Sequence, residues 1–214
     1  MTRIKICGIT LPDDAARASM LGVDFIGLNF WPRSKRYVQP ERGPLLAAAA
    51  RGAGPAKVVG LFVDPDVDEV LEITKAVDLD VIQLHGDESP DLCKRISLAV
   101  YRPVWKAVPV AAERDVEHLD VFQTEAILLD APTPGRGGAG ARFDHQHARS
   151  ARERFPRMNI VLAGGLTPET VAAAIALVEP WAVDVASGVE AAPGIKDPAK
   201  LQAFVAAVRA TARS

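Results

Sequence analysis

The chain has 214 residues, 49% of them hydrophobic, and a formal net charge of −2 at pH 7. This length suffices for one sizeable core, so we expect a single domain spanning residues 1–214. The charge balance lacks the basic stripe that nucleic acid or an anionic membrane would require, which favours a small-molecule partner. With no signal-peptide pattern and no apolar run long enough to span a bilayer, the sequence indicates a cytoplasmic protein, either a monomer or a homodimer.

The first predicted strand contains the β-branched residues Ile4 and Ile6 and ends at Cys7, where Gly8 interrupts it. The segment Thr10–Asp13 then predicts a helix start, with a side-chain cap, a proline in the first turn and an acid after it. Together they form a βα unit that places a thiol at a strand end. A small apolar core residue is the alternative interpretation of Cys7.

About eight short apolar or β-branched runs alternate with Ala- and Leu-rich amphipathic stretches along the chain. Several of these runs begin about 23 residues apart, which suits one strand and one helix per unit. We therefore predict an α/β fold of the (β/α)8 TIM-barrel type. An open doubly wound sheet is the alternative, although it would more often carry a Gly-rich fingerprint after its first strand. The later runs cover residues 24–30, 57–63, 80–85, 103–108, 126–130, 159–163 and 182–186.

Proline-containing caps predict three further helix starts, at Ser89–Pro90, Thr167–Pro168 and Asp197–Pro198. Cys93 falls inside the first of these helices, so a disulfide with Cys7 is not expected in a cytoplasmic chain. Longer connections follow the second and sixth strands, at residues 31–38 and 131–143. The second is rich in glycine and is a candidate lid over a site, with an unconstrained surface loop as the alternative.

Two glycine-containing turns follow the last two predicted strands, and their residues are Gly164, Gly165, Ser187 and Gly188. In TIM barrels the loops at these two positions often bind a phosphate through backbone N–H groups. Each turn alone would more often be a plain connection, but the pair at these positions predicts a phosphate site.

The motifs along the whole chain resemble those of the phosphoribosylanthranilate isomerase family. The segments that carry the resemblance are residues 5–10, 34–38, 59–63, 83–86, 129–130 with 143–144, 163–166 and 184–190. The chain departs from the family pattern at Ala139, Ala141, His145 and Ala186. The resemblance implies a small barrel of tryptophan biosynthesis, acting on a phosphosugar–anthranilate substrate without cofactor or metal.

The resemblance also implies the reaction, an Amadori rearrangement of N-(5-phosphoribosyl)anthranilate to 1-(2-carboxyphenylamino)-1-deoxyribulose 5-phosphate. An acid must protonate the ring oxygen, and a base must remove the C2 proton. The family pattern assigns the base to Cys7 and the acid to Asp130. It also favours Arg36, over Arg33 and Lys35, as the residue that binds the substrate carboxylate through paired hydrogen bonds.

Two further residues are candidates for substrate binding, each with a structural alternative. His85 ends the fourth predicted strand and either binds substrate or is satisfied by hydrogen bonds to the neighbouring backbone. Asp184 lies in an apolar run and either positions a catalytic partner or forms a structural ion pair, for example with Lys5. A phosphosugar epimerase and a non-catalytic phosphate-sensing barrel are the competing functions. The first would typically need paired carboxylates with metal-binding histidines or a Glu base, and the second would need neither Cys7 nor Asp130.

Overall fold

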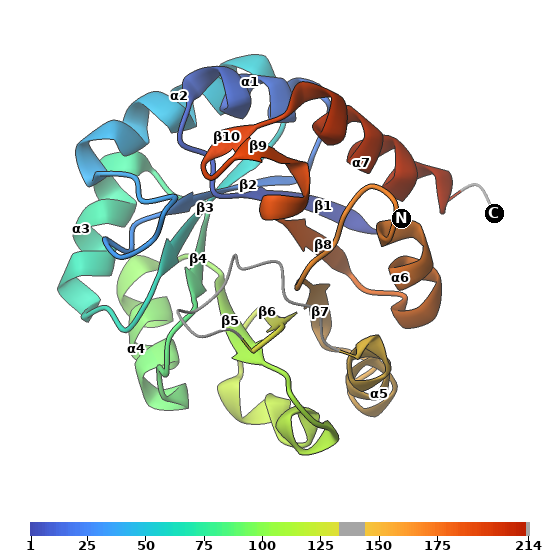
Figure 1. Ribbon diagram of the computed structural model, residues 1–214. Helices are drawn as coiled ribbons and strands as arrows, with labels where there is room; N and C mark the ends of the chain where they lie inside the picture. Colours follow the sequence, from blue (N-terminus) through green and yellow to red (C-terminus); the bar gives the residue numbers. More distant parts are fainter. Residues whose placement is uncertain (133–143, 213–214) are drawn as a thin grey trace.

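The structure, a computed structural model, describes residues 1–132 and 144–212 and contains a closed barrel of eight parallel strands (Figure 1). The strands follow one another around the ring in chain order, and β1 closes it by pairing with β8. This arrangement confirms the predicted (β/α)8 fold and excludes the open sheet. The strands are β1 (Arg3–Cys7), β2 (Phe25–Asn29), β3 (Lys57–Phe62), β4 (Val81–Leu84), β5 (Val104–Pro109), β6 (Ala126–Asp130), β7 (Asn159–Leu162) and β8 (Ala182–Val185).

Helices surround the barrel on its outer side (Figure 1). They are α1 (Pro12–Met20), α2 (Gly43–Ala53), α3 (Val67–Val77), α4 (Pro90–Val100), α5 (His145–Arg154), α6 (Val171–Val178) and α7 (Pro198–Ala210), with the short η1 (Pro40–Arg42) before α2. Between β5 and β6 the chain forms two 3-10 helices instead, η2 (Glu113–Val116) and η3 (Leu119–Phe122). In the described part of the chain, none of the helices is long and apolar enough to cross a membrane.

Two of the predicted helix caps are confirmed and two are not. The side chain of Ser89 accepts a hydrogen bond from Leu92 N, and that of Asp197 accepts from Ala199 N and Lys200 N. By contrast, α1 begins after Leu11 without a side-chain cap, because the Thr10 hydroxyl donates to Gly194 O instead, at 2.6 Å. The helix predicted from Thr167–Pro168 begins only at Val171, since a turn closed by Thr170 N and Thr167 O precedes it.

Two apolar layers hold the barrel. The larger one fills the space between the strands and the surrounding helices. The smaller one fills the barrel interior with side chains from β2 to β8, among them Phe25, Val59, Trp105, Leu128 and Val161. At β1 the inward positions belong to Lys5 and Cys7, because alternate residues of a strand face the same side. The apolar interior layer is therefore interrupted at β1, where these two polar side chains face inward.

An additional hairpin leaves the barrel after β8. Residues Ser187–Val189 form the short 3-10 helix η4, which leads into β9 (Glu190–Ala192) and β10 (Ile195–Lys196), paired antiparallel. The hairpin lies on the side of the barrel where β1, β2 and β8 end (Figure 1). The sequence had not predicted it, since two strands of three and two residues leave no periodic pattern.

Candidate functional site

The predicted catalytic residues are the last residues of their strands, and both occupy inward-facing positions. Cys7 follows Lys5 on the inner face of β1, and Asp130 follows Leu128 on the inner face of β6. In the closed ring β7 and β8 separate these two strands on the shorter side, so the two residues border the same mouth. Both therefore line the end of the barrel where TIM-barrel enzymes carry their sites.

Cys7 is buried, and its thiol lies above Gly27 of the neighbouring strand. A Cβ at Gly27 would lie 2.9 Å from Cys7 Sγ and 3.1 Å from Lys5 Nζ, so glycine is needed for both groups to fit. The Lys5 ammonium is fully buried and donates to Asp184 Oδ1 at 3.0 Å. This is the ion pair anticipated as the structural alternative for Asp184, and it lies beside the thiol.

The charges around Cys7 act on its pKa in opposite directions. Burial, the largest effect, raises the pKa of the thiol, and the Asp184 carboxylate raises it further, while the ammonium groups of Lys5 and Lys196 lower it. The net pKa is raised. For Lys5, burial acts to lower the pKa, but Asp184 and Cys7 outweigh it, so the pKa of Lys5 is raised and the group stays protonated.

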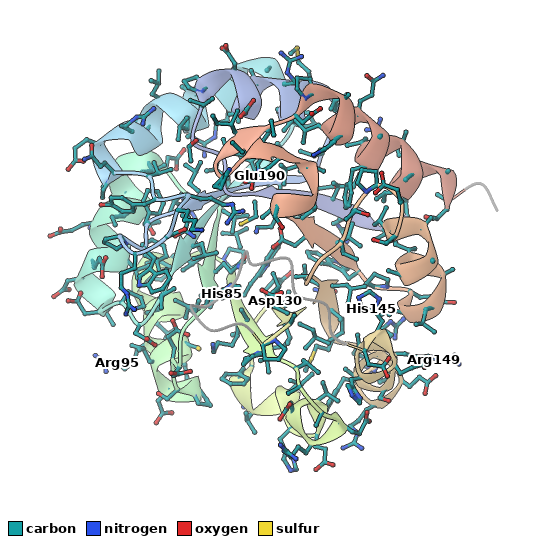
Figure 2. All side chains as sticks on the ribbon, in the orientation of Figure 1. His85, Arg95, Asp130, His145, Arg149 and Glu190 are labelled. Atoms are coloured by element: carbon teal, nitrogen blue, oxygen red, sulfur yellow. The ribbon has the colours of Figure 1, made fainter. Side chains whose placement is uncertain are left out.

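His85 and Asp130 form a pair on the other side of the mouth (Figure 2). His85 Nε2 lies 3.4 Å from Asp130 Oδ2, and the second carboxylate oxygen accepts from Ala131 N at 2.8 Å. His85 Nδ1 lies 3.0 Å from Gln83 Nε2, an amide donor. With Nδ1 accepting from Gln83, the imidazole proton is on Nε2, the ring nitrogen nearer Asp130. The partners of His85 are thus the side chains of Gln83 and Asp130 and not the neighbouring backbone, and the imidazole lies against the carboxylate of the proposed acid.

Arg36 reaches the mouth from the loop after β2 and pairs with a residue to which the sequence analysis assigned no role. Its Nε donates to Glu190 Oε1 at 2.7 Å, and its Nη2 donates to Oε2 at 2.6 Å. Lys196 Nζ donates to the same carboxylate at 2.9 Å and to the carbonyls of Cys7 and Ala186. Arg36, Glu190 and Lys196 form one buried charged cluster next to the end of β1, which we call the hairpin cluster.

The predicted phosphate turns lie next to one another. Gly164 and Gly165 have φ of 84° and 68°, which favours glycine. A Cβ at Gly188 would lie 2.0 Å from Leu166 O, so the turn after β8 packs directly on the turn after β7. Among the described residues, no acceptor pairs with the backbone N–H groups of Gly164, Gly165, Ser187 or Gly188. These donors are available to an anion.

Gln83, Glu190 and Lys196 belong to the site but were not predicted from the sequence. Gln83 and Glu190 lie in segments that carry the family resemblance, so a signal was present, but nothing local indicated that Glu190 pairs with Arg36. The candidate lid at residues 131–143 lies, apart from Ala131 and Pro132, outside the described residues.

A cavity of about 430 Å³ lies at the opposite end of the barrel, lined by η3, the start of β7 and the end of α5. None of the predicted site residues lines it, and TIM-barrel chemistry takes place at the other face, so we assign it no catalytic role. Within the described ranges, no three His, Cys, Asp or Glu side chains are grouped so that they could hold a metal ion.

Comparison with known proteins gives a family match over nearly the whole chain. Residues 4–207 match the family described as N-(5'phosphoribosyl)anthranilate (PRA) isomerase. A relative from Ralstonia nicotianae, named N-(5'-phosphoribosyl)anthranilate isomerase, is 45% identical, and the aligned region covers 97% of this chain and 93% of the relative. A Thermotoga maritima relative of the same name is 42% identical, with 96% and 97% covered.

Solved structures agree with this match. The crystal structure of phosphoribosyl anthranilate isomerase from Thermotoga maritima superimposes with a TM-score of 0.89 at 40% identity, covering 98% of this chain and 100% of that one. A phosphoribosyl anthranilate isomerase in complex with reduced 1-(o-carboxyphenylamino)-1-deoxyribulose 5-phosphate has a TM-score of 0.86 at 38% identity, with the same coverage. The likeness therefore extends over the barrel and its hairpin.

Proposed function

This chain belongs to the N-(5'-phosphoribosyl)anthranilate isomerase family, which acts in tryptophan biosynthesis, and we propose that Cys7 and Asp130 perform the proton transfers of the isomerase reaction. The reaction is the Amadori rearrangement of N-(5'-phosphoribosyl)anthranilate to 1-(2-carboxyphenylamino)-1-deoxyribulose 5-phosphate. The observation that carries the assignment is the position of one thiol and one carboxylate on inward-facing ends of β1 and β6.

Asp130 acts first, as the general acid. It protonates the furanose ring oxygen, so that the ring opens and the amino group forms a Schiff base with C1. The contact with His85 at 3.4 Å and the hydrogen bond from Ala131 N orient the carboxyl group toward the mouth. His85 contributes by orienting the acid.

Cys7 acts second, as the general base. Its thiolate removes the C2 proton of the Schiff base, which gives an enolamine that then tautomerises to the ketone. The thiolate is the active form, and the ammonium groups of Lys5 and Lys196 stabilise it within a buried site.

The two ends of the substrate bind on different parts of the mouth. The backbone donors at Gly164, Gly165, Ser187 and Gly188 bind the phosphate, which explains why two turns at the barrel mouth leave N–H groups unpaired among the described residues. The guanidinium of Arg36 binds the anthranilate carboxylate. The C1–C2 region of the sugar then lies between them, near Cys7 and Asp130.

A turnover assay on phosphoribosylanthranilate, with and without a chelator, tests this function. We expect Cys7→Ala and Asp130→Asn each to lower kcat by a factor of about 10² to 10⁴, with a much smaller effect on KM, because each group acts in proton transfer. Near-normal turnover in either variant would remove that residue from the mechanism. A wild-type protein that fails to convert this substrate would refute the function itself.

A further inference from the structure

We propose that Glu190 is the residue that positions Arg36 and thereby sets the preference of this site for a substrate that carries a carboxylate. The inference rests on the proposed function, because it takes Arg36 as the group that binds anthranilate. It starts from the bidentate contact between Arg36 and Glu190, with distances of 2.7 and 2.6 Å, which connects the loop after β2 to the hairpin after β8.

The contact uses one edge of the guanidinium and leaves another unused. A guanidinium carries five N–H groups, and two adjacent nitrogens present parallel N–H bonds along each of its edges. Glu190 occupies the edge formed by Nε and Nη2. Among the described residues, Nη1 has no acceptor, so the edge formed by Nη1 and Nη2 can bind a second carboxylate. Arg36 is therefore arranged to bind two carboxylates at once, one from the protein and one from the substrate.

The surroundings of Arg36 restrict its side chain to this orientation. Its aliphatic part lies directly on Gly8, where a Cβ would come within 2.3 Å of Arg36 Cδ. Gly8 has a φ of 74°, which also favours glycine. With the stem against Gly8 and one edge held by Glu190, the guanidinium is fixed beside Cys7. An arginine held in this way loses little further side-chain entropy when it binds a ligand.

The charges of the hairpin cluster match a substrate with one carboxylate at this end. Arg36 and Lys196 are cationic and Glu190 is anionic, so the cluster carries one net positive charge when all three are ionised. Lys196 is occupied by Glu190 and two carbonyl oxygens. The unbalanced positive charge therefore belongs to the unpaired edge of Arg36, which is where a ligand carboxylate would bind.

Further hydrogen bonds hold Glu190 in position in addition to its contact with Arg36. Oε1 accepts from the backbone N–H of Gly194 at 3.2 Å, and Lys200 Nζ donates to the Glu190 carbonyl at 2.8 Å. Thr10 and Lys196 join the hairpin to α1 and to the end of β1. The hairpin thus holds the carboxylate of Glu190 in a fixed place relative to the barrel.

The test is a double-mutant cycle on Arg36 and Glu190, with kinetics on phosphoribosylanthranilate and inhibition by inorganic phosphate as readouts. Glu190→Gln keeps the shape of the side chain but loses the charged, bidentate contact. We expect KM to rise about tenfold or more, with kcat changed less and phosphate inhibition changed by less than about twofold. In an Arg36→Ala background, Glu190→Gln should have an effect below about twofold, because Glu190 acts through Arg36.

Glu88→Gln serves as the matched control, because Glu88 also forms a buried ion pair, with Lys106 at 2.9 Å. It should lower thermal stability without a selective rise in KM. If Glu190→Gln cannot be purified folded, Glu190→Asp, whose shorter side chain keeps the charge but shifts the carboxylate, should give the same selective rise in KM.

Three outcomes would overturn the inference: unchanged KM in the folded variants, an equal effect with and without Arg36, or the same selective rise in KM in Glu88→Gln. An inactive wild-type protein would instead refute the proposed function.

Discussion

Because Gly27 has no side chain, the Cys7 thiol and the Lys5 ammonium group can lie next to one another at the end of β1. Lys5 Nζ and Cys7 Sγ both lie so close to this glycine that any Cβ there would displace one of them. The Asp184 carboxylate on β8 then neutralises Lys5 at 3.0 Å. The base of the proposed reaction is therefore surrounded by fixed charges, which also include Lys196 and Arg36.

The raised pKa of Cys7 predicts a pH dependence of the reaction. Burial keeps the thiol protonated to a higher pH than an exposed cysteine, and only the thiolate accepts the C2 proton. We therefore expect kcat/KM to increase as the pH rises above neutrality and passes through the raised pKa of Cys7 in the free enzyme. A pH–rate profile measures this. A profile that stays flat, or falls, across the alkaline range would contradict Cys7 as the base.

The ion pair of Lys5 and Asp184 predicts opposite effects of its two members on the thiol. Lys5→Met removes a charge that lowers the pKa of Cys7, so this pKa should rise. Asp184→Asn removes a charge that raises it, so it should fall.

The rate of alkylation of Cys7 by iodoacetamide, followed by peptide mapping at several pH values, reports the pKa of this thiol in each variant. Cys93, whose pKa burial raises to about 11, is read separately in the same maps as an internal reference. Shifts of the Cys7 pKa in the same direction in both variants would show that the pair acts only through the fold.

At the scale of elements, the turns after β7 and β8 act as one unit because they touch. A Cβ at Gly188 would lie 2.0 Å from Leu166 O, so the backbones of the two turns are in direct contact. The hairpin of β9 and β10 continues from the second turn and carries Glu190 and Lys196 to the hairpin cluster. In the proposed binding mode, the turn after β8 contributes to the phosphate site, and the hairpin that follows it holds Glu190, the partner of Arg36.

Gly188→Val should disrupt this unit. The added Cβ would lie 2.0 Å from a backbone oxygen, so the turns must separate. We expect a sharp rise in KM, weaker inhibition by inorganic phosphate, and a loss of about 1–3 kcal/mol in the free energy of unfolding.

Gly52→Ala is the control, since nothing lies within 4 Å of its Cβ and the residue lies in α2. It should leave KM unchanged and add roughly 0.5–1 kcal/mol of stability. Unaltered phosphate inhibition in Gly188→Val would mean that the phosphate binds elsewhere.

At the scale of the whole molecule, the barrel depends on an interior layer that is separate from the larger layer under the helices. Trp105 is the largest fully buried side chain and belongs to the interior layer. It packs edge-on against Phe25 at 4.8 Å and against Trp181 at 5.6 Å, measured between ring centroids. These three rings join β2, β5 and the residue that precedes β8 across the barrel.

Trp105→Ala should therefore destabilise the entire fold. Truncation of a buried tryptophan costs about 3–5 kcal/mol, because transfer energy is lost and a cavity remains. Urea unfolding measures this loss. Leu98→Ala, at an exposed position of α4, should cost less than about 0.5 kcal/mol. A similar small cost for Trp105→Ala would show that the interior layer contributes little to stability.

Local pattern determined the elements and the direction of the inward-facing residues. Short apolar runs with breakers predicted the eight strands, and the alternation of Lys5 with Cys7 and of Leu128 with Asp130 follows from the two-residue period of a strand. The caps at Ser89 and Asp197 were predictable because a capping side chain bonds within three residues of its own position. The candidate acid and base could be named from the sequence for the same reason, with the family resemblance assigning their roles.

Only the closed barrel decided which charges meet. Lys5 and Asp184 are 179 residues apart in the chain, and Arg36 and Glu190 are 154 apart, so no local pattern connects them. The sequence predicts Thr10 as a helix cap, yet its hydroxyl donates to Gly194 O, 184 residues away, because the hairpin packs against the start of α1. Pairing of β1 with β8 brings the carboxyl ends of the first and last barrel strands to one mouth, and this contact exists only after the ring has closed.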